Sequence, residues 1–371
     1  MSGLYIHIPF CAQACHYCDF HFSTNQSIRE DMVKMIAREI ELQSGYLQSK
    51  SIDTIYFGGG TPSILTPNET ELLINTVYKT FVVSPKAEIT LEANPDDLNS
   101  VKIHSLKSAG INRLSIGIQS FYEPHLKFLN RIHSSQEAID SVREAQKAGI
   151  ENITIDLIYG IEHPDHQIWK KDLQMALTLE VPHISSYCLT IEPTTVFGKW
   201  VKQKKMFPAD DEFAAIQFEI LMDTLEGAGY EHYEISNFAK PGWHSRHNSN
   251  YWLGAAYLGI GPSAHSYNGA SRQFNISNNS LYLKELSMNK ILFEKEELND
   301  KEKVNEYLMT RIRTKWGCDL NEIRNSFRDL IEEKATHLEK QGLLIIEKKM
   351  VKLTRKGKLL ADFITGELFV E

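Results

Sequence analysis

Three cysteines near the start of the chain have the spacing of a metal-binding loop. They are Cys11, Cys15 and Cys18, in the pattern C-x3-C-x2-C, and they follow an apolar run at residues 4–8 that reads as a strand. Three thiolates can bind three irons of a [4Fe-4S] cube and leave the fourth iron without a protein ligand. An open metal position usually takes an exchangeable ligand, as it does at catalytic zinc sites. The spacing therefore predicts an iron–sulfur cluster that also binds a small molecule.

A disulfide or a zinc site explains these thiols less well. Disulfides need pairs, and three cysteines in one loop leave one over. Tetrahedral zinc usually takes four protein ligands, and His16 lies between two of the cysteines, where its ring cannot easily join them. The loop resembles that of the radical S-adenosylmethionine (SAM) enzymes. This resemblance implies that the amino and carboxylate groups of SAM chelate the free iron.

The elements that must position this loop alternate regularly between strand and helix. The expected strands after the first lie at 54–57, 88–92, 113–119, 152–158 and 183–189. Capping boxes S/T-x-x-E begin helices at Ser27, Thr66 and Ser134, and a further helix is expected over about 96–109. Glycines 110, 149 and 229 suit the position that ends a helix. Six such units predict an α/β fold, a partial (β/α)6 TIM-type barrel over residues 1–240 with the cluster loop at 11–18.

Polar residues gather at the expected carboxyl ends of these strands, where barrel folds place their sites. A glycine-rich turn, 58–62, lets backbone approach a ligand closely, and Glu92, Gln119 and Asp156 lie at or near three later strand ends. Any one of these side chains, taken alone, could simply form hydrogen bonds with backbone groups of a loop. Taken together, acids and amides suit the ribose diol of SAM, and Arg131 suits its carboxylate.

Five segments resemble one radical SAM family, which comprises the oxygen-independent coproporphyrinogen III oxidase HemN and the haem chaperone HemW. They are Tyr5-Ile-His-Ile-Pro-Phe-Cys11, Gly58-Gly-Gly-Thr-Pro62, Leu91-Glu-Ala-Asn-Pro95, Gly117-Ile-Gln-Ser120 and Asp156-Leu-Ile-Tyr-Gly160. The resemblance implies that SAM is contacted at its carboxylate by Tyr5 and Arg131, at its amino group by Gly59, Gly60 and Thr61, near its adenine by Tyr17, and near its ribose by Glu92, Gln119 and Asp156. It also implies a backbone-type contact from Cys188, whose thiol we expect to be a small buried hydrophobe.

Two departures separate the chain from the oxidase. Phe20 stands where the oxidase has a fourth cysteine, and only ten residues precede Cys11, where the oxidase has an extension that closes over its substrate. Both departures resemble HemW, as does the segment His247-Asn248-Ser-Asn-Tyr251-Trp252, which matches the motif H-N-x-x-Y-W. From the residues alone, a structural or solvent-facing histidine is the favoured interpretation. With the resemblance, His247 becomes the expected haem ligand, with Asn248 orienting its ring and the two aromatics supplying apolar area.

The last part of the chain, 300–371, is expected to form a separate domain, joined to the barrel by 241–299. Helices are expected at 301–314 and 328–341, followed by a hairpin of 343–346 with 351–353 and a last helix capped by Thr354. This pattern is winged-helix-like, which invites a DNA-binding interpretation. From Asp300 onward, however, 15 Lys/Arg stand against 13 Asp/Glu, and three glutamates on the second helix would repel phosphate. We therefore expect an α+β structural or partner-docking domain.

The composition of the chain further limits the classes of function that it can have. The 371 residues are 42% hydrophobic and 24% charged, which suits one large and one smaller domain. The sequence has no run of about 18 apolar residues, so we expect no membrane span. A peripheral contact with a membrane stays open. The residues before Cys11 lack the features of a secretory signal, and five cysteines with three clustered indicate a reducing cytoplasm. The net charge of −8 argues against a general nucleic-acid binder.

Two functions follow from the resemblance. The first is a haem chaperone that binds haem, a [4Fe-4S] cluster and SAM and delivers haem to an unidentified acceptor protein. The alternative is coproporphyrinogen III oxidase activity, in which a 5′-deoxyadenosyl radical starts decarboxylation of the substrate propionates. Phe20 and the short segment before Cys11 favour the chaperone. A radical SAM enzyme with another substrate stays open, because SAM contacts do not identify a second ligand.

Overall fold

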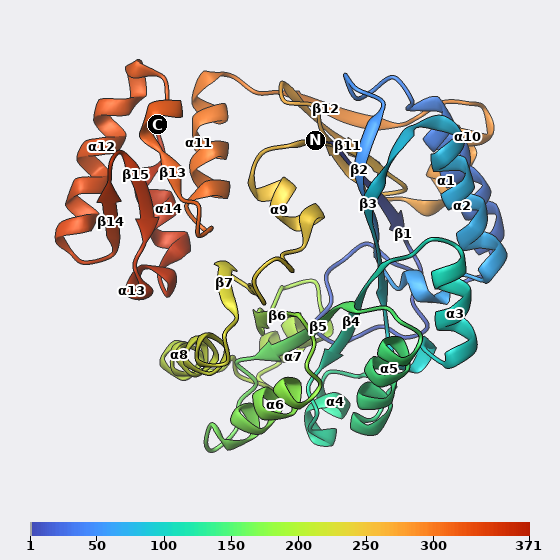
Figure 1. Ribbon diagram of the computed structural model, residues 1–371, viewed down its shortest axis with the longest axis horizontal. Helices are drawn as coiled ribbons and strands as arrows, with labels where there is room; N and C mark the ends of the chain where they lie inside the picture. The colour runs from blue at the N-terminus through green and yellow to red at the C-terminus, as the bar shows by residue number, and fades with distance from the viewer. Residues whose placement is uncertain (1) are drawn as a thin grey trace.

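The computed structural model describes residues 2–371, and a curved twelve-stranded sheet forms its main body. Six strands of this sheet are parallel neighbours in chain order: β1 (Ser2–Ile8), β2 (Ser51–Gly59), β3 (Val82–Ala93), β4 (Arg113–Gln119), β5 (Asn152–Tyr159) and β6 (His183–Cys188). Figure 1 shows the helices between them on the outer face of the sheet: α1 (Arg29–Leu42), α2 (Pro67–Thr80), α3 (Ser100–Ser108), α5 (Ser135–Lys147) and α6 (Gln167–Thr178). The predicted partial (β/α)6 barrel is confirmed.

Further strands extend both edges of this parallel core. Beyond β6 lie β8 (Asn237–Ala239) and β7 (Glu231–Glu234), which follow helix α8 (Asp211–Gly227). Beyond β1 lies β9 (Ala256–Ile260), which pairs with it in parallel. Then come β10 (His265–Tyr267), β11 (Ser271–Asn275) and β12 (Phe293–Glu297), with α10 (Asn279–Ser287) before the last strand. Within residues 2–371 the end strands β12 and β7 do not pair with each other, so the barrel is open.

The helix boundaries confirm some sequence signals and correct others. Thr66 and Ser134 form the predicted capping boxes of α2 and α5. Ser27 does not cap α1, which begins at Arg29 after a turn in which Arg29 N–H donates to Gln26 O at 3.0 Å. Glu30, the expected partner of Ser27, pairs instead with Lys34. The helix expected over 96–109 is a 3-10 turn, η2 (Pro95–Asp97), followed by α3, which Asn99 caps.

The end of the chain folds around a second hydrophobic core. Its helices are α11 (Asp300–Arg311), α12 (Asn325–Lys340), α13 (Arg355–Lys358) and α14 (Ala361–Leu368), and its small antiparallel sheet is β13 (Cys318–Asp319), β15 (Met350–Leu353) and β14 (Leu344–Glu347). The predicted hairpin is therefore present. Thr354 caps α13, but a further helix, α14, follows it. The first helix ends at Arg311, before the expected 314, and the second begins at Asn325, before the expected 328.

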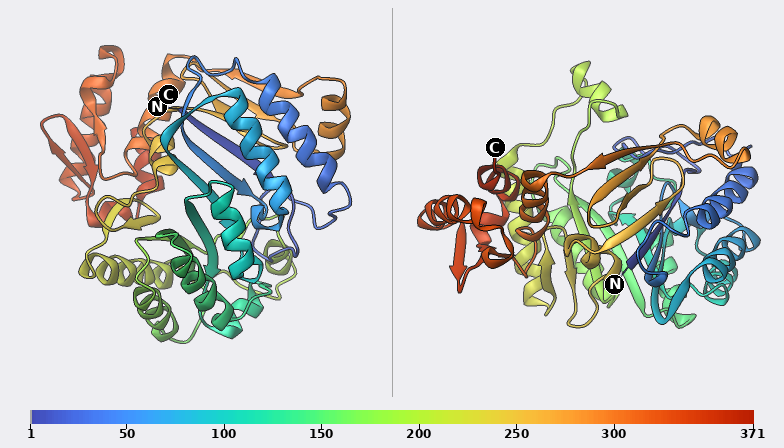
Figure 2. Two further views of the ribbon diagram at one scale, coloured as in Figure 1. Left: turned by 45° about the vertical axis from the view of Figure 1, so that its right-hand side comes forward. Right: turned by 90° about the horizontal axis from the view of Figure 1, so that it is seen from above.

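This C-terminal domain lies beside one edge of the barrel, as Figure 2 shows from above. Lys315 N–H donates to Tyr233 O at 2.9 Å, and Arg311 donates to Leu253 O at 3.1 Å. Between the two bodies lies α9 (Arg246–Trp252), the helix that carries the H-N-x-x-Y-W residues (Figure 1). Within residues 2–371, no helix is both long and apolar enough to cross a membrane.

Candidate functional site

A cavity of about 550 Å³, called the outer cavity here, opens at the carboxyl ends of the parallel strands. Its wall contains most of the residues that the sequence singled out: Cys11, Cys15, Tyr17, Cys18, Gly59, Gly60, Thr61, Glu92, Gln119, Arg131, Asp156 and Cys188. These residues follow different strands, and the parallel arrangement brings the strand ends to one side of the sheet. Cys188 is exposed at the end of β6, so our expectation that its thiol is buried is wrong.

Backbone contacts hold the cysteine loop over this cavity. Cys11 N–H donates to Ser23 O at 3.1 Å, and His16 Nδ1 lies 2.9 Å from Phe128 O, with its ring packed against Trp200. His16 is thereby turned toward other partners, as the sequence argument requires. Burial raises the pKa of the Cys11 thiol to about 12 and that of Cys18 to about 11. Metal binding needs thiolates and therefore opposes this effect of burial.

The residues around the thiols fit an iron–sulfur cluster. Thr61 Oγ1 donates to Cys11 Sγ at 3.3 Å, and Arg131 Nη1 donates to Cys15 Sγ at 3.4 Å. A Cβ atom on Gly60 would lie 2.5 Å from Phe10 O, so only glycine allows the backbone to pass so close to the loop. Among residues 2–371, no three His, Cys, Asp or Glu side chains form a group that could hold a metal ion. A cube differs from such a site because each thiolate binds a different iron.

Arg131 and Gln119 also line the outer cavity, and neighbouring residues fix both of them. Arg131 Nη2 donates to Asn94 Oδ1 and to Gly117 O, both at 2.7 Å, while its buried Nε has no partner among the described residues. Gln119 has a φ of 69°, in the left-handed region that non-glycine residues rarely adopt. A Cβ on Gly117 would lie 2.9 Å from Gln119 Nε2, so the glycine leaves room for this amide. Such strain is typical of ligand-binding positions.

Two carboxyl groups lie deeper, where the outer cavity meets the barrel interior. Glu92 accepts hydrogen bonds from Tyr56 OH at 2.7 Å and from Gly59 N–H at 3.2 Å, and burial raises its pKa to about 7. Burial also raises the pKa of Asp156 to about 6, although Ser115 Oγ donates to it at 3.4 Å. In its ionised form each group can accept hydrogen bonds from the two hydroxyls of a ribose diol.

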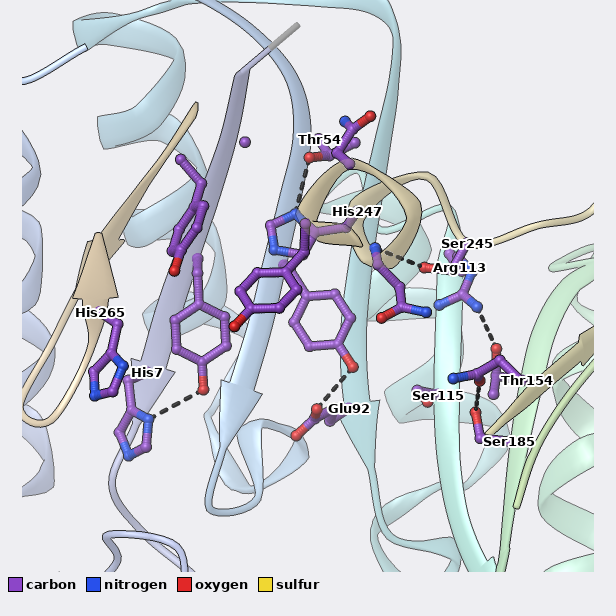
Figure 3. Close-up of a pocket in the computed structure, with 18 of the residues that line it drawn as sticks. His7, Thr54, Glu92, Arg113, Ser115, Thr154, Ser185, Ser245, His247 and His265 are labelled. Atoms are coloured by element: carbon purple, nitrogen blue, oxygen red, sulfur yellow. Dashed lines mark hydrogen bonds between the residues drawn. The ribbon is translucent and has the colours of Figure 1, made fainter. Parts of the chain in front are cut away.

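A second cavity, of about 450 Å³, lies inside the barrel between the strands and α9, and is called the inner cavity here. Figure 3 shows side chains from several strands pointing into it. Tyr5 and His247 line this cavity and not the outer one. Phe20, Glu92, Ser115, Asp156 and Tyr187 line both, so the two cavities adjoin.

The His247 ring is held at the wall of the inner cavity by two residues of β2. Its Nδ1 lies 2.8 Å from Thr54 Oγ1, and its plane stacks on Tyr56 with ring centroids 5.0 Å apart (Figure 3). Burial, and next the positive charge of Arg113, lower the pKa of His247 to about 4. At neutral pH the imidazole is therefore uncharged. Its Nε2 has no hydrogen-bond partner among residues 2–371, which leaves that nitrogen free for a ligand at the cavity wall.

The rest of the H-N-x-x-Y-W segment differs from expectation in two respects, of which the first is that Trp252 does not line the inner cavity. Asn248 does not orient the imidazole, because its Nδ2 donates to Tyr233 OH and to Glu234 Oε1, both at 3.2 Å. It anchors α9 to β7 instead. Tyr251 does line the inner cavity, and its ring meets that of Trp252 at 5.7 Å.

Most residues of the inner cavity wall were not expected from the sequence. This wall is built by polar residues that alternate along the strands, as in Thr54 and Tyr56 of β2, or Arg113 and Ser115 of β4. Alternate residues of a strand face the same side, so these positions share the barrel interior. This alternation of polar residues along the strands was the sequence signal for a polar barrel interior.

Comparison with known proteins agrees with this geometry. Residues 5–174 match the radical SAM superfamily, and residues 298–360 match the HemN C-terminal domain. The chain is 37% identical to the heme chaperone HemW of Lactococcus lactis, over 96% of this chain and 94% of that protein. It is 32% identical to the heme chaperone HemW of Bacillus subtilis, over the full length of both.

Among solved structures, the fold matches that of coproporphyrinogen III oxidase (HemN) from Escherichia coli, a radical SAM enzyme. The TM-score is 0.85 at 21% sequence identity, with 100% of this chain and 90% of that chain covered. At this identity the match establishes the fold, and the curated relatives establish the family. The chain belongs to the HemW family of the radical SAM superfamily.

Proposed function

We propose that this protein is a haem chaperone that binds haem in the inner cavity and transfers it to an acceptor protein. The observation that carries the proposal is the placement of His247: a neutral imidazole, fixed through Nδ1, with Nε2 free at the wall of a large internal cavity. A neutral imidazole is a common protein ligand of haem iron, and a partner on its other nitrogen orients it. The names of the HemW relatives support the same function.

We further propose that the outer cavity holds a [4Fe-4S] cluster on Cys11, Cys15 and Cys18, with SAM beside it. Arg131, Gly59, Gly60 and Thr61 would bind the amino-acid end of SAM, and Tyr17 its adenine. Glu92, Gln119 and Asp156 would bind the ribose, with Cys188 at the rim. When bound, such a cluster supplies an electron to the sulfonium of SAM. Tyr5 lies in the inner cavity, so a direct contact between its side chain and SAM would have to form at the junction of the two cavities.

One observation favours the alternative, coproporphyrinogen III oxidase activity. The outer and inner cavities adjoin through Glu92, Asp156 and three other residues, so a ligand of the inner cavity would lie next to SAM. Against it, the position of the oxidase's fourth cysteine holds Phe20, whose exposed ring lines both cavities. Fold similarity to HemN does not decide between the two functions, because one fold can carry many activities.

Two assays on one reconstituted preparation test the proposal. Haem is titrated into the purified protein, and the same protein is incubated anaerobically with coproporphyrinogen III, SAM and a reductant. We expect saturable haem binding at one haem per chain and little or no decarboxylated product. Formation of the divinyl product at a catalytic rate, without saturable haem binding, would contradict the chaperone function and support the alternative. Location in the cytoplasm and the existence of an acceptor protein stay predictions.

A further inference from the structure

We infer that Arg113 and Asn250 form a carboxylate-binding site in the wall of the inner cavity, and that a haem propionate is the group that it binds. This inference rests on the proposed haem binding and adds to it the polar contact that would orient the ring. Two buried donors without protein partners, both bordering the cavity that contains His247, carry it.

Arg113 lies at the start of β4 with its side chain inside the barrel, and it is 2% exposed. Among the described residues, the Arg113 side chain makes one hydrogen bond, from Nη2 to Thr154 Oγ1, and its Nε has no hydrogen-bond partner (Figure 3). A buried guanidinium with unused donors is costly, because desolvation of the charge is not repaid. The arrangement therefore calls for an acceptor that the protein itself does not provide.

Glu88 does not fully provide that acceptor. Its Oε2 lies 3.9 Å from Arg113 Nε, beyond hydrogen-bond distance. Both of its oxygens are already used by the first turn of α9, since they accept the backbone N–H groups of Arg246 at 3.1 Å and His247 at 3.0 Å. Glu88 thus fixes the helix that carries His247. It compensates the buried positive charge of Arg113 only in part.

Asn250 provides the second donor. It lies three residues after His247 on α9, so both side chains are on the same face of the helix, and both line the inner cavity. Its buried Nδ2 has no hydrogen-bond partner within residues 2–371. A planar guanidinium and an amide, both donating, are typical of carboxylate recognition.

The charges of the cavity wall point to Arg113 as the position for an anion. Among the lining residues, all within the described part of the chain, Arg113 is the only lysine or arginine. Glu92 and Asp156 border the side shared with the outer cavity. Burial raises the pKa of Asp156 and the positive charge of Arg113 lowers it, so this carboxyl offsets part of that charge, and negative charge on this side would oppose a second carboxylate. Haem carries two propionates, so a haem whose iron is near His247 can present a carboxylate to Arg113.

The test compares haem with haem dimethyl ester, in which both carboxylates are blocked, on wild-type protein and variants. We expect wild-type protein to bind haem at least tenfold more tightly than the diester. Arg113→Gln should remove most of this preference by weakening haem and leaving the diester almost unchanged. Asn250→Ala, which changes no charge, should reduce the preference several-fold. This variant tests the inference on its own if Arg113→Gln fails to fold.

Arg272→Gln is the matched control. Arg272 lies outside the inner cavity, in a groove between the barrel and the C-terminal domain, where it pairs with Glu306. We expect this variant to keep the full preference for haem. If Arg272→Gln removes the preference, or if Arg113→Gln and Asn250→Ala weaken haem and diester equally, the inference is wrong while haem binding stands. If wild-type protein binds neither compound, the proposed function itself fails.

Discussion

At the scale of single residues, each proposed cysteine ligand is held differently. Cys11 is buried and accepts a hydrogen bond from Thr61, while Cys15 accepts one from Arg131. Cys15→Ala removes one of three thiolates and should therefore lose most of the cluster iron and its charge-transfer absorbance. Iron analysis and absorbance after anaerobic reconstitution measure this. Cys318→Ala is the control, because Cys318 is buried in the separate C-terminal core and should leave the cluster intact. Full cluster content in Cys15→Ala would refute the assignment.

The second prediction concerns Gln119, whose left-handed backbone directs its amide into the outer cavity. Gln119→Ala should weaken SAM binding by roughly 1–3 kcal/mol, because a buried hydrogen bond to the ribose is lost. The affinity is measured by equilibrium dialysis on protein with a full cluster. Gln136→Ala, on the exterior helix α5, is the control. Unchanged affinity in Gln119→Ala would show that the ribose lies elsewhere.

At the scale of elements, Asp172 ties helix α6 to the turn that follows β4. It accepts hydrogen bonds from Ser120 Oγ at 2.6 Å and from Phe121 N–H at 2.9 Å, and burial raises its pKa to about 6 from the ordinary 3.8. The folded protein therefore keeps this proton to a higher pH than the unfolded chain does. Its contribution to the free energy of unfolding falls as the pH rises from about 4 to about 6.

Asp172→Asn cannot ionise and should lack this dependence. Relative to wild type, the variant should gain about 2 kcal/mol of unfolding free energy between pH 4.5 and pH 7. Urea unfolding at both pH values measures the difference. Asp329→Asn, at an exposed position of α12, should show no such gain. Equal pH dependence of Asp172→Asn and wild type would contradict the pKa assigned to the buried carboxyl.

The parallel strands and the polar strand ends were predictable because their signals are local. Capping residues, helix-ending glycines and apolar runs sit within a few positions of one another, as with Thr66 and Glu69 of α2. The capping box expected at Ser27 does not form, because Glu30 pairs instead with Lys34, one turn along the helix. The capping pattern alone cannot show which of the two contacts forms.

The inner cavity was not predictable in the same way. Thr54, Arg113 and His247 are far apart in the chain, and only the register of the strands and the placement of α9 bring them together. The strand β9, which follows α9, pairs in parallel with β1 at the start of the chain, and only its other neighbour, β10, is close in sequence. The alternation of polar residues along a strand shows which side chains share one face, but it does not show that β1 pairs with β9 or that α9 lies over that face.

At the scale of the whole molecule, the two largest hydrophobic cores among residues 2–371 predict two unfolding steps. One core fills the space between the sheet and its outer helices, and the other is confined to the C-terminal domain. Leu308→Ala should lower the free energy of unfolding of the C-terminal domain, and Leu114→Ala that of the barrel, each by about 2–5 kcal/mol. The melting temperature of the corresponding transition should fall with it. Differential scanning calorimetry separates the two. A single transition that both substitutions shift equally would show that the two bodies unfold as one unit.

The central claim is that haem binds at His247 in the inner cavity. The most direct measurement is the absorbance spectrum of haem-loaded protein for wild type, His247→Ala and the control His244→Ala, whose ring pairs with Glu231 outside that cavity. We predict that His247→Ala shifts the Soret band and weakens haem binding, while His244→Ala and the cluster content of both variants match wild type. An unchanged haem spectrum in His247→Ala would contradict the claim, and His265, which lines the same cavity, would then be the ligand to test.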